Sequence, residues 1–509
     1  MMKGEHTEVN REDLLADRVG KTGQPQLKKE LNLSHMVGMV VGGIIGSGIF
    51  ISPREVVVDV QSYGMALLVW FFAGVLAMGG GLCYSELGTM IKKSGGEFAF
   101  LKTAYSFTNE TSRHHVVGEL ISFLFAWTNS LFGKPAASAI VLLTLGEYTM
   151  KVFQWYGEIS TTSIRLLAIF TLGVLVLLNC YSTRVSAMMG AGLSLVKMIA
   201  AVVIIAFGLW YYHNAPETHS VGLFKGTTSN PTKIVFAFYA ALWAYDGWNS
   251  LSYAAEEVEN AEKTLPRAIL IGLPIVILVY LLINISFFVV FSIHEMENVA
   301  SEAIAIPFGY KSMKEIGQVT IPLIVACSTF GAANASIFVI ARLNYASARE
   351  GMLPKFLASI HTRYKTPVPA LLFHATLTAL LIFSGGIVDL LNAFSAATWA
   401  FYTLCFGGLI IMRFSHPQTP RPFKVWIVIP IVMSICGVVL VILPLTDPAD
   451  SLYELMALGI VLLGVPVYFV AIQGYWKPPI LTKINDQLAV TLDNFLNTTS
   501  SIVTETISS

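Results

Sequence analysis

Apolar stretches of about 20 residues or more recur along nearly the whole chain after residue 34. Each stretch is long enough to cross roughly 30 Å of hydrocarbon as a helix. The composition agrees, because 55% of the residues are hydrophobic and only 13% are charged, which is outside the usual range of soluble proteins. The sequence therefore predicts an all-α membrane protein.

Hydropathy predicts one twelve-helix domain over residues 35–476. The twelve spans are expected at residues 35–58, 64–90, 115–148, 164–182, 187–212, 233–256, 268–292, 319–344, 368–385, 387–412, 425–446 and 452–475. Residues 1–34 hold interspersed charges and no apolar core, so we predict an N-terminal cytoplasmic tail. Residues 477–509 form the predicted C-terminal tail, with an interfacial helix built on spaced apolar residues.

Sidedness follows from Lys and Arg in the short loops, which are enriched on the cytoplasmic side of membrane proteins. Basic loops at 92–113, 342–365 and 413–424 alternate with comparatively acidic ones at 294–302 and 447–450. Together with the even number of spans, this alternation predicts that both termini are cytoplasmic.

Composition and motifs exclude several function classes. The 32 basic residues balance the 32 acidic ones and no basic run occurs, which argues against a nucleic-acid partner. The five cysteines lack metal-ligand spacing, so no metal site is expected. Neither a nucleophile elbow nor a P-loop is present, so we predict neither an enzyme nor a cofactor.

Two spans have sequences that favour unwinding in mid-membrane. Span 1 contains four glycines and a serine within seven residues (42–48), and span 6 contains Trp-Ala-Tyr-Asp-Gly-Trp-Asn at 243–249. Their five-span separation is what a pair of inverted five-helix repeats produces, and broken helices at corresponding positions point to a substrate site. Alternatively, Gly42, Gly46 and Gly48 only allow close helix packing.

The chemistry of such breaks suits a zwitterion. Amides left free at Ser47 and Gly48, at the N-terminus of a half-helix, can bind a carboxylate. Carbonyls freed near Ile44, Trp243 and Asp246 can bind an amino group. The predicted substrate-binding residues of the two breaks are Ile44, Ile45, Gly46, Ser47, Gly48, Trp243, Ala244, Asp246 and Gly247.

Gly42 to Phe50 is similar to the Gly-Thr-Ile-Ile-Gly-Ser-Gly-Ile-Phe segment of the light chains of heteromeric amino acid transporters, in the amino acid-polyamine-organocation superfamily. Further matching segments follow in order at Ser85–Gly88, Lys93–Glu97, Glu256–Asn260, Ser347–Gly351 and Arg421–Val425. The resemblance covers roughly residues 28–476. It implies a LeuT-like fold with 5+5 inverted repeats and broken helices 1 and 6, and amino acid transport at the plasma membrane by alternating access.

Within span 6, residues 242–249 resemble the b(0,+)-type light chain, which exchanges cationic amino acids and cystine for neutral ones. A carboxylate in a bilayer is costly and usually functional, so Asp246 is predicted to pair with a cationic substrate side chain. The resemblance makes Trp243 an aromatic gate over the substrate. The alternatives are an Asp246 that breaks the helix or pairs within the protein, and a Trp243 that only packs.

Lys197 and Asn334 complete the predicted site, and Lys134 and Thr398 bear on the comparison with the light chains. The resemblance places Lys197 in the region of a sodium site, which implies sodium-independent transport, whereas snorkelling is the alternative. It also places Asn334 near the substrate, although such a residue often only joins helices. Lys134 matches a basic residue of the light chains with an open role. Thr398 replaces an arginine of the cystine/glutamate antiporter, which disfavours anionic substrates.

The light chains carry a cysteine between spans 3 and 4 for a disulfide to a glycoprotein heavy chain, but residues 148–162 contain none. The chain is therefore expected to work alone or with a non-covalently held heavy chain. The expected activity is sodium-independent exchange of cationic and large neutral amino acids. The alternatives are a facilitator for neutral aromatic and branched amino acids, and a non-transporting sensor or scaffold.

Overall fold

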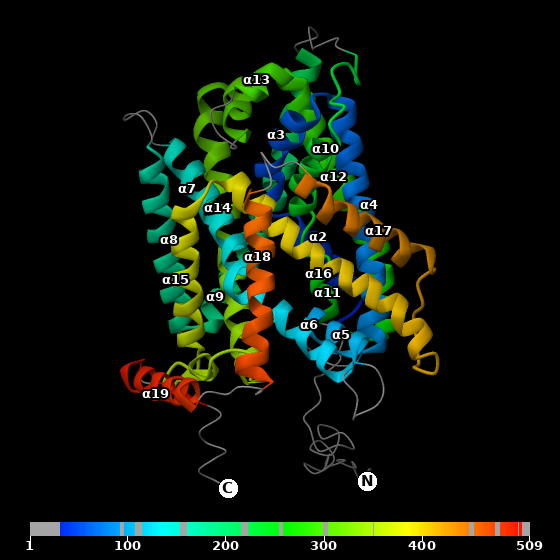
Figure 1. Cartoon of the computed structure of the whole chain (residues 1–509). Helices are drawn as coiled ribbons and strands as arrows, with labels where there is room; N and C mark the ends of the chain where they lie inside the picture. The colour runs from blue at the N-terminus through cyan, green and yellow to red at the C-terminus, as the bar shows by residue number, and fades with distance from the viewer. Residues whose placement is uncertain are drawn as a thin grey trace, which may run out of the picture.

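A computed structural model describes residues 31–500 except for short gaps. The gaps are residues 92–95, 107–113, 153–159, 215–221, 254–257, 299–303, 350, 447–451, 474–478 and 497. Parts of the resembling segments at 93–97 and 256–260, and of the loop without a cysteine, therefore lie outside the described residues. The described chain is a bundle of roughly aligned helices (Figure 1).

The apolar helices follow one another in the order that hydropathy predicts. They are α2 (Leu33–Ile44), α3 (Gly48–Val60), α4 (Tyr63–Met90), α6 (His114–Thr128) continued by the π-helix η1 (Asn129–Gly133) and α7 (Lys134–Val152), α8 (Thr161–Tyr181), α9 (Thr183–Asn214), α10 (Pro231–Ala244), α12 (Ala261–Val290), α14 (Ala305–Arg349), α15 (Val368–Ser384), α16 (Ile387–Ser415), α17 (Val428–Ile442) and α18 (Leu452–Val467) continued by the π-helix η6 (Tyr468–Ile472).

Nine helices of the described chain are long and apolar enough to cross a membrane, and the bent pair α2 and α3 makes ten. The all-α, multi-span class is thus confirmed. The other two predicted spans coincide with shorter apolar helices, α10 with 14 residues and α15 with 17 residues. The first of these is short because span 6 is interrupted at Tyr245.

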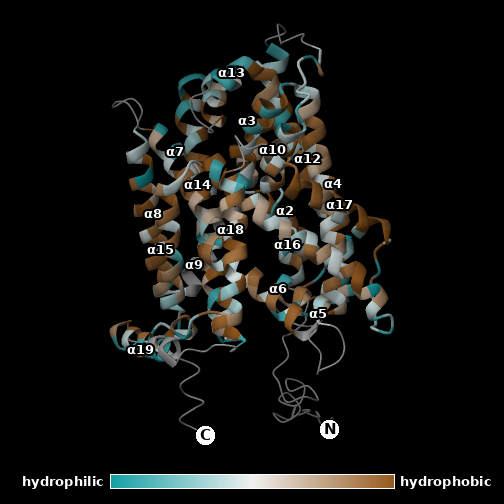
Figure 2. Ribbon diagram, viewed as in Figure 1, coloured by the Kyte–Doolittle hydropathy of each residue, from teal (hydrophilic) through white to brown (hydrophobic). Residues whose placement is uncertain are grey.

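Apolar residues predominate along the long helices of the bundle (Figure 2), and many of their large side chains face outward. On α8, for example, the large side chains of Leu166, Phe170 and Leu177 are 58%, 68% and 71% exposed. In water such a surface would be costly, whereas lipid tails match it, so these faces fit a bilayer rather than an aqueous solvent.

Short elements mark the two ends of the bundle. α5 (Glu97–Tyr105) and α19 (Pro479–Leu496) lie at one end, and α13 (Ile293–Glu297) lies at the other (Figure 1). α11 (Ser250–Tyr253), η4 (Lys355–Ala358) and η5 (Pro444–Thr446) are single turns. The basic loops and the acidic loop with α13 thus lie at opposite ends, as the charge pattern requires.

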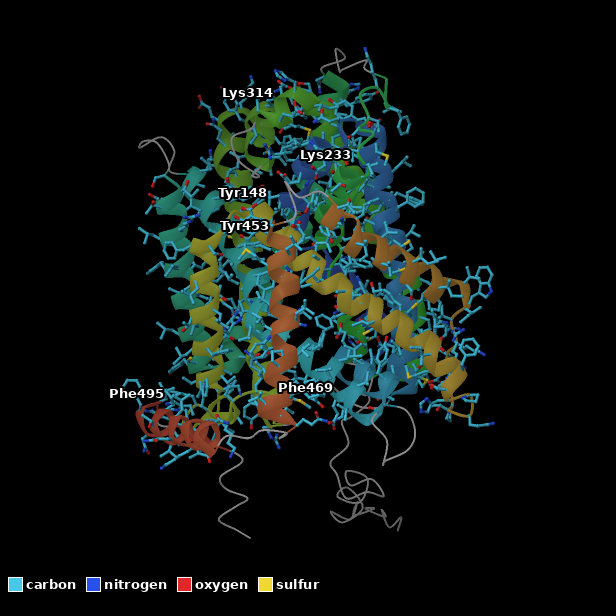
Figure 3. All side chains as sticks on the ribbon, viewed as in Figure 1. Tyr148, Lys233, Lys314, Tyr453, Phe469 and Phe495 are labelled. Carbon is cyan, nitrogen blue, oxygen red and sulfur yellow. The ribbon has the colours of Figure 1, made fainter. Side chains whose placement is uncertain are left out.

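A helix occurs where the sequence predicts an interfacial one, and it is fastened to the bundle. The strand β2 (Thr498–Ser500) after α19 pairs antiparallel with β1 (Ser359–His361). The Lys355 ammonium also lies 2.8 Å from an oxygen of Asp486 on α19. The Phe495 side chain of α19 is 83% exposed (Figure 3). That this surface enters a lipid interface stays a prediction.

Candidate functional site

The first helix break falls where the glycine-rich segment predicts it. α2 ends at Ile44, α3 begins at Gly48, and the two helices are bent by 54°. Ser47 is the N-cap of α3, and its side chain makes no capping hydrogen bond. The first amides of a helix have no intrahelical partner, so the start of α3 presents N–H groups to the break. Gly42 and Gly43, the first two residues of the glycine-rich segment, lie inside α2, so unwinding begins later in that segment than its first glycines suggest.

The second break interrupts span 6. α10 ends at Ala244, five residues form a turn, and α11 begins at Ser250. Gly247 has φ +112°, a conformation that L side chains rarely adopt, so a glycine is required there. The Ser250 hydroxyl donates a hydrogen bond of 2.6 Å to the Gly247 carbonyl and stabilises the turn.

The two breaks lie against each other, which the sequence predicted only through their repeat positions. A Cβ added to Gly48 would stand 2.5 Å from Cα of Ala244, so α3 and α10 touch backbone to backbone. A Cβ added to Gly247 would stand 3.3 Å from the Gly43 carbonyl oxygen. The glycines therefore allow close helix packing as well as unwinding, and these two interpretations of the glycine-rich segment are compatible.

A tyrosine that the sequence analysis missed connects the breaks. Tyr280 of α12 is fully buried, and its hydroxyl lies 2.9 Å from the Ile44 carbonyl oxygen and 2.8 Å from the Ala244 carbonyl oxygen. These are the last residues of α2 and α10, whose carbonyls have no intrahelical partner. One hydroxyl proton is thus shared between two helix ends.

Asp246 lies half-buried in the turn of span 6. Its Oδ1 accepts a hydrogen bond of 3.1 Å from the hydroxyl of Tyr402 on α16. Among the described residues, it forms no ion pair with a Lys, Arg or His side chain. The carboxylate is therefore held by a neutral donor within the protein, so the alternative in which a protein partner satisfies Asp246 stays open.

Trp243 lies in an apolar cluster near the end of α10. Its ring meets Phe394 of α16 edge to face, with centroids 4.9 Å apart. Phe132 from the π-helical turn η1 and Ala136 from α7 belong to the same cluster. Its indole nitrogen is buried and has no hydrogen-bond partner within the described part of the chain. π-helical turns inside helices are frequent at functional sites.

The remaining predicted residues lie on neighbouring helices. Asn334 on α14 is 2% exposed and accepts a hydrogen bond of 3.0 Å from Asn179 on α8. That contact joins two helices and favours the packing alternative. Lys197 on α9 is 7% exposed, and α9 packs against α12 and α14. Lys134 is the first residue of α7, directly after η1, and its role stays open.

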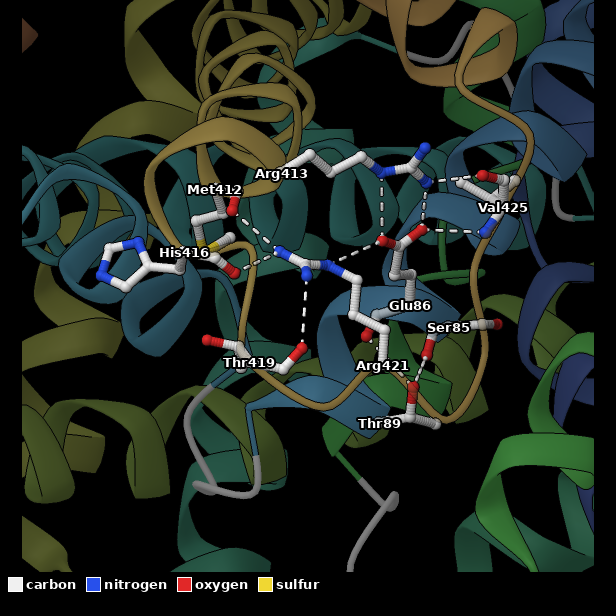
Figure 4. Close-up of polar contacts among 9 residues, drawn as sticks. All are labelled: Ser85, Glu86, Thr89, Met412, Arg413, His416, Thr419, Arg421 and Val425. Carbon is white, nitrogen blue, oxygen red and sulfur yellow. Dashed lines mark hydrogen bonds and ion pairs between the residues drawn. The ribbon is translucent and has the colours of Figure 1, made fainter.

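Two of the resembling segments, at 85–88 and 421–425, meet in a buried ion cluster (Figure 4). Glu86 of α4 is fully buried and accepts hydrogen bonds from Arg413 Nε at 3.2 Å and from the Val425 amide at 2.8 Å. Arg421 Nε lies 3.6 Å from the same carboxylate. The cluster fixes the loop after α16 to the end of α4.

A multi-span helical chain with two facing breaks inside its bundle has the architecture of a secondary transporter. Comparison of the sequence with known proteins agrees, and the chain belongs to the amino acid permease family, whose sequence model matches residues 31–466. The protein is thus a membrane transporter rather than an enzyme.

Three relatives illustrate the similarity. The chain is 36% identical to the b(0,+)-type amino acid transporter 1 of Mus musculus over 469 residues, which is 92% of either protein. It is 36% identical to the cystine/glutamate transporter of Homo sapiens, over 92% of this chain and 91% of the relative. It is 35% identical to the large neutral amino acids transporter small subunit 2 of Mus musculus, over 90% and 83%. The resemblance inferred from the sequence motifs is confirmed.

Proposed function

We propose that this transporter is a sodium-independent exchanger of cationic and large neutral L-amino acids that works by alternating access. The observation that carries the proposal is the Asp246 carboxylate. It lies half-buried in the break of span 6, beside the break of span 1, with a tyrosine hydroxyl and no described cation as its partner.

The backbone at the two breaks supplies hydrogen-bonding groups for the carboxylate and the ammonium that all amino acid substrates carry. The substrate carboxylate binds the amides of Ser47 and Gly48 at the positive end of α3. The substrate ammonium binds carbonyls at the ends of α2 and α10, at Ile44 and Trp243. A carbonyl oxygen has two lone pairs, so Ile44 can accept from Tyr280 and from a substrate together.

Side chains around the break of span 6 select the substrate side chain. Asp246 pairs with the cationic head of arginine or lysine. The cluster of Trp243, Phe132 and Phe394 takes the methylene stem of these substrates, or the whole side chain of a large neutral amino acid. One pocket can therefore serve both classes, which fits the similarity to a b(0,+)-type transporter and to a large neutral amino acid transporter.

Sodium independence rests on Lys197, whose ammonium replaces a bound sodium ion in this proposal. Its burial on α9 supports that role, because a charged group inside a bilayer protein is costly and usually functional. Thr398 leaves span 10 without the arginine that an acidic substrate side chain needs. Exchange follows if the empty carrier reorients slowly and bound substrate stabilises the passage.

Location and partners form part of the same proposal. We place the chain in the plasma membrane with both termini in the cytoplasm, which the alternation of basic and acidic loops supports. One relative is by name a small subunit, which supports an accessory chain as one option for this protein. Without a cysteine at residues 148–162, a heavy chain is held non-covalently or is not needed.

The test is uptake of labelled arginine and leucine into liposomes that contain only the purified chain, with and without internal amino acid and sodium. Asp246→Gly and Asp246→Asn are compared with Asp389→Asn, which removes a carboxylate at the start of α16 away from the break. We expect sodium-independent arginine uptake that internal amino acid stimulates. Both Asp246 variants should lose arginine uptake and keep leucine uptake.

Other outcomes would select the alternatives. Leucine uptake without arginine uptake in the wild type would identify a facilitator for neutral amino acids. If folded protein takes up neither substrate, reconstitution with a heavy chain separates a required partner from a sensor or scaffold without transport. Uptake that requires sodium would refute the role of Lys197.

A further inference from the structure

Beside the turn of span 6, aromatic side chains from three helices and from the turn itself pack into one layer, which we call the aromatic layer. Its members are Tyr84 of α4, Phe100 of α5, Trp248 of the turn, and Tyr402 and Phe406 of α16. The Tyr84 ring lies 4.8 Å from that of Trp248 and 5.5 Å from that of Phe100, both edge to face. The layer thus connects the turn of span 6 with α4, α5 and α16.

Tyr402 belongs to this layer and to the proposed site at once. Its ring centroid lies 4.9 Å from that of Trp248, and its hydroxyl donates to Asp246, two residues earlier in the same turn. The side chain is only 5% exposed, and Trp399 packs against it edge to face at 5.7 Å. The hydroxyl position is therefore fixed by packing that does not depend on the substrate.

The far end of the turn is held as well. The Asn249 amide donates a hydrogen bond of 2.7 Å to a carboxylate oxygen of Glu97 on α5. Residues 246–249 are thus fastened at one end to α16 and at the other to α5. The Asp246 carboxylate therefore has a defined orientation. A substrate cation requires this, because the hydrogen bonds of an ion pair form only when the two charged groups are suitably oriented.

We propose that Tyr402 is a specificity-determining residue that orients Asp246 for cationic substrates, and this inference rests on the proposed function. Its hydroxyl donates to Oδ1 and leaves Oδ2 for the incoming guanidinium or ammonium. A neutral substrate does not use the carboxylate, so it is insensitive to this hydrogen bond. Tyr402 is thus a positioning residue for one of the two substrate classes.

The test is Tyr402→Phe, which removes the hydroxyl and keeps the ring in the aromatic layer. We expect kcat/KM for arginine uptake to fall about ten-fold or more relative to that for leucine, the effect of one hydrogen bond to a charged group. The matched control is Tyr105→Phe, whose hydroxyl donates to the Leu404 carbonyl at 2.9 Å and does not contact Asp246. The control should leave the ratio of arginine to leucine uptake unchanged.

The double variant with Asp246→Asn separates this inference from the proposed function. If Asp246→Asn removes arginine uptake and Tyr402→Phe changes the ratio only when Asp246 is present, the two residues act together. Equal losses for arginine and leucine in Tyr402→Phe, or no loss for either, would overturn the inference alone. Unchanged arginine uptake in Asp246→Asn would instead overturn the proposed function.

Discussion

Replacing Tyr280 with Phe tests whether one hydroxyl keeps the two helix breaks together. The substitution removes an oxygen that lies 2.9 Å from the Ile44 carbonyl and 2.8 Å from the Ala244 carbonyl. The ring keeps its packing against Trp70, at 5.5 Å, and against Tyr245, at 4.9 Å. Any effect is therefore due to the hydrogen bonds rather than to lost volume.

The size of the effect follows from the burial of the acceptors. A buried acceptor left without its partner costs about 1–3 kcal/mol. Two helix-terminal carbonyls share the Tyr280 proton, so we expect the upper end of this range, about 3 kcal/mol. If the same hydrogen bonds hold the two breaks together during transport, the loss of about 3 kcal/mol lowers uptake by about 100-fold, equally for arginine and leucine.

The assays are thermal unfolding of the purified protein in detergent and uptake of both substrates into liposomes. Tyr148→Phe is the matched control, because this fully buried tyrosine donates at 2.9 Å to the Phe50 carbonyl inside α3. That carbonyl lies within the helix and keeps its intrahelical partner. The control should cost about 1 kcal/mol and affect transport only through stability.

Two results would show that the Tyr280 hydroxyl does not hold the breaks together. If Tyr280→Phe is no less stable than Tyr148→Phe and transports both substrates at the wild-type rate, the shared hydroxyl does not hold the breaks. A loss confined to arginine would show the same, because backbone carbonyls at helix ends cannot distinguish substrate side chains.

Three further predictions follow from other contacts. Gly48→Ala should lower stability by about 1–3 kcal/mol and abolish uptake, since its methyl would stand 2.5 Å from Ala244 Cα, whereas Gly42→Ala, with nothing within 4 Å, should fold and transport normally. Glu86→Gln should lower the thermal stability by about 3–5 kcal/mol because it leaves Arg413 and Arg421 buried without their carboxylate; an unchanged Tm would contradict this. Burial alone would raise the pKa of Glu295, but hydrogen bonds from Lys311 and Ser292 hold it at about 2. Its contribution to stability is therefore complete above its ordinary pKa of 4.5 and is lost as the pH falls towards 2, so wild type and Glu295→Gln should converge in Tm over this window.

The amino-acid sequence by itself determined the class of protein and the position of both breaks. Helix length and apolar character are local properties, so a window of about 20 residues reveals each span without its neighbours. The effect of glycine is local in the same way, and the segment at 42–48 contains the first break, which the structure places at residues 45–47. Asp246 was recognisable because a carboxylate inside an apolar span is costly wherever its partners lie.

Only the tertiary structure decided which side chains complete the site. Tyr280 lies 236 residues from Ile44, and Tyr402 lies 156 residues from Asp246. In the sequence both tyrosines look like ordinary aromatic residues of an apolar span. The partners of their hydroxyls, two backbone carbonyls for Tyr280 and the Asp246 side chain for Tyr402, belong to other segments of the chain. Asn334 shows the same dependence on folding, since its hydrogen bond with Asn179 joins two helices and favours the packing alternative. Hydropathy is summed along the chain, whereas a hydrogen bond depends on two groups that folding brings within about 3 Å of each other.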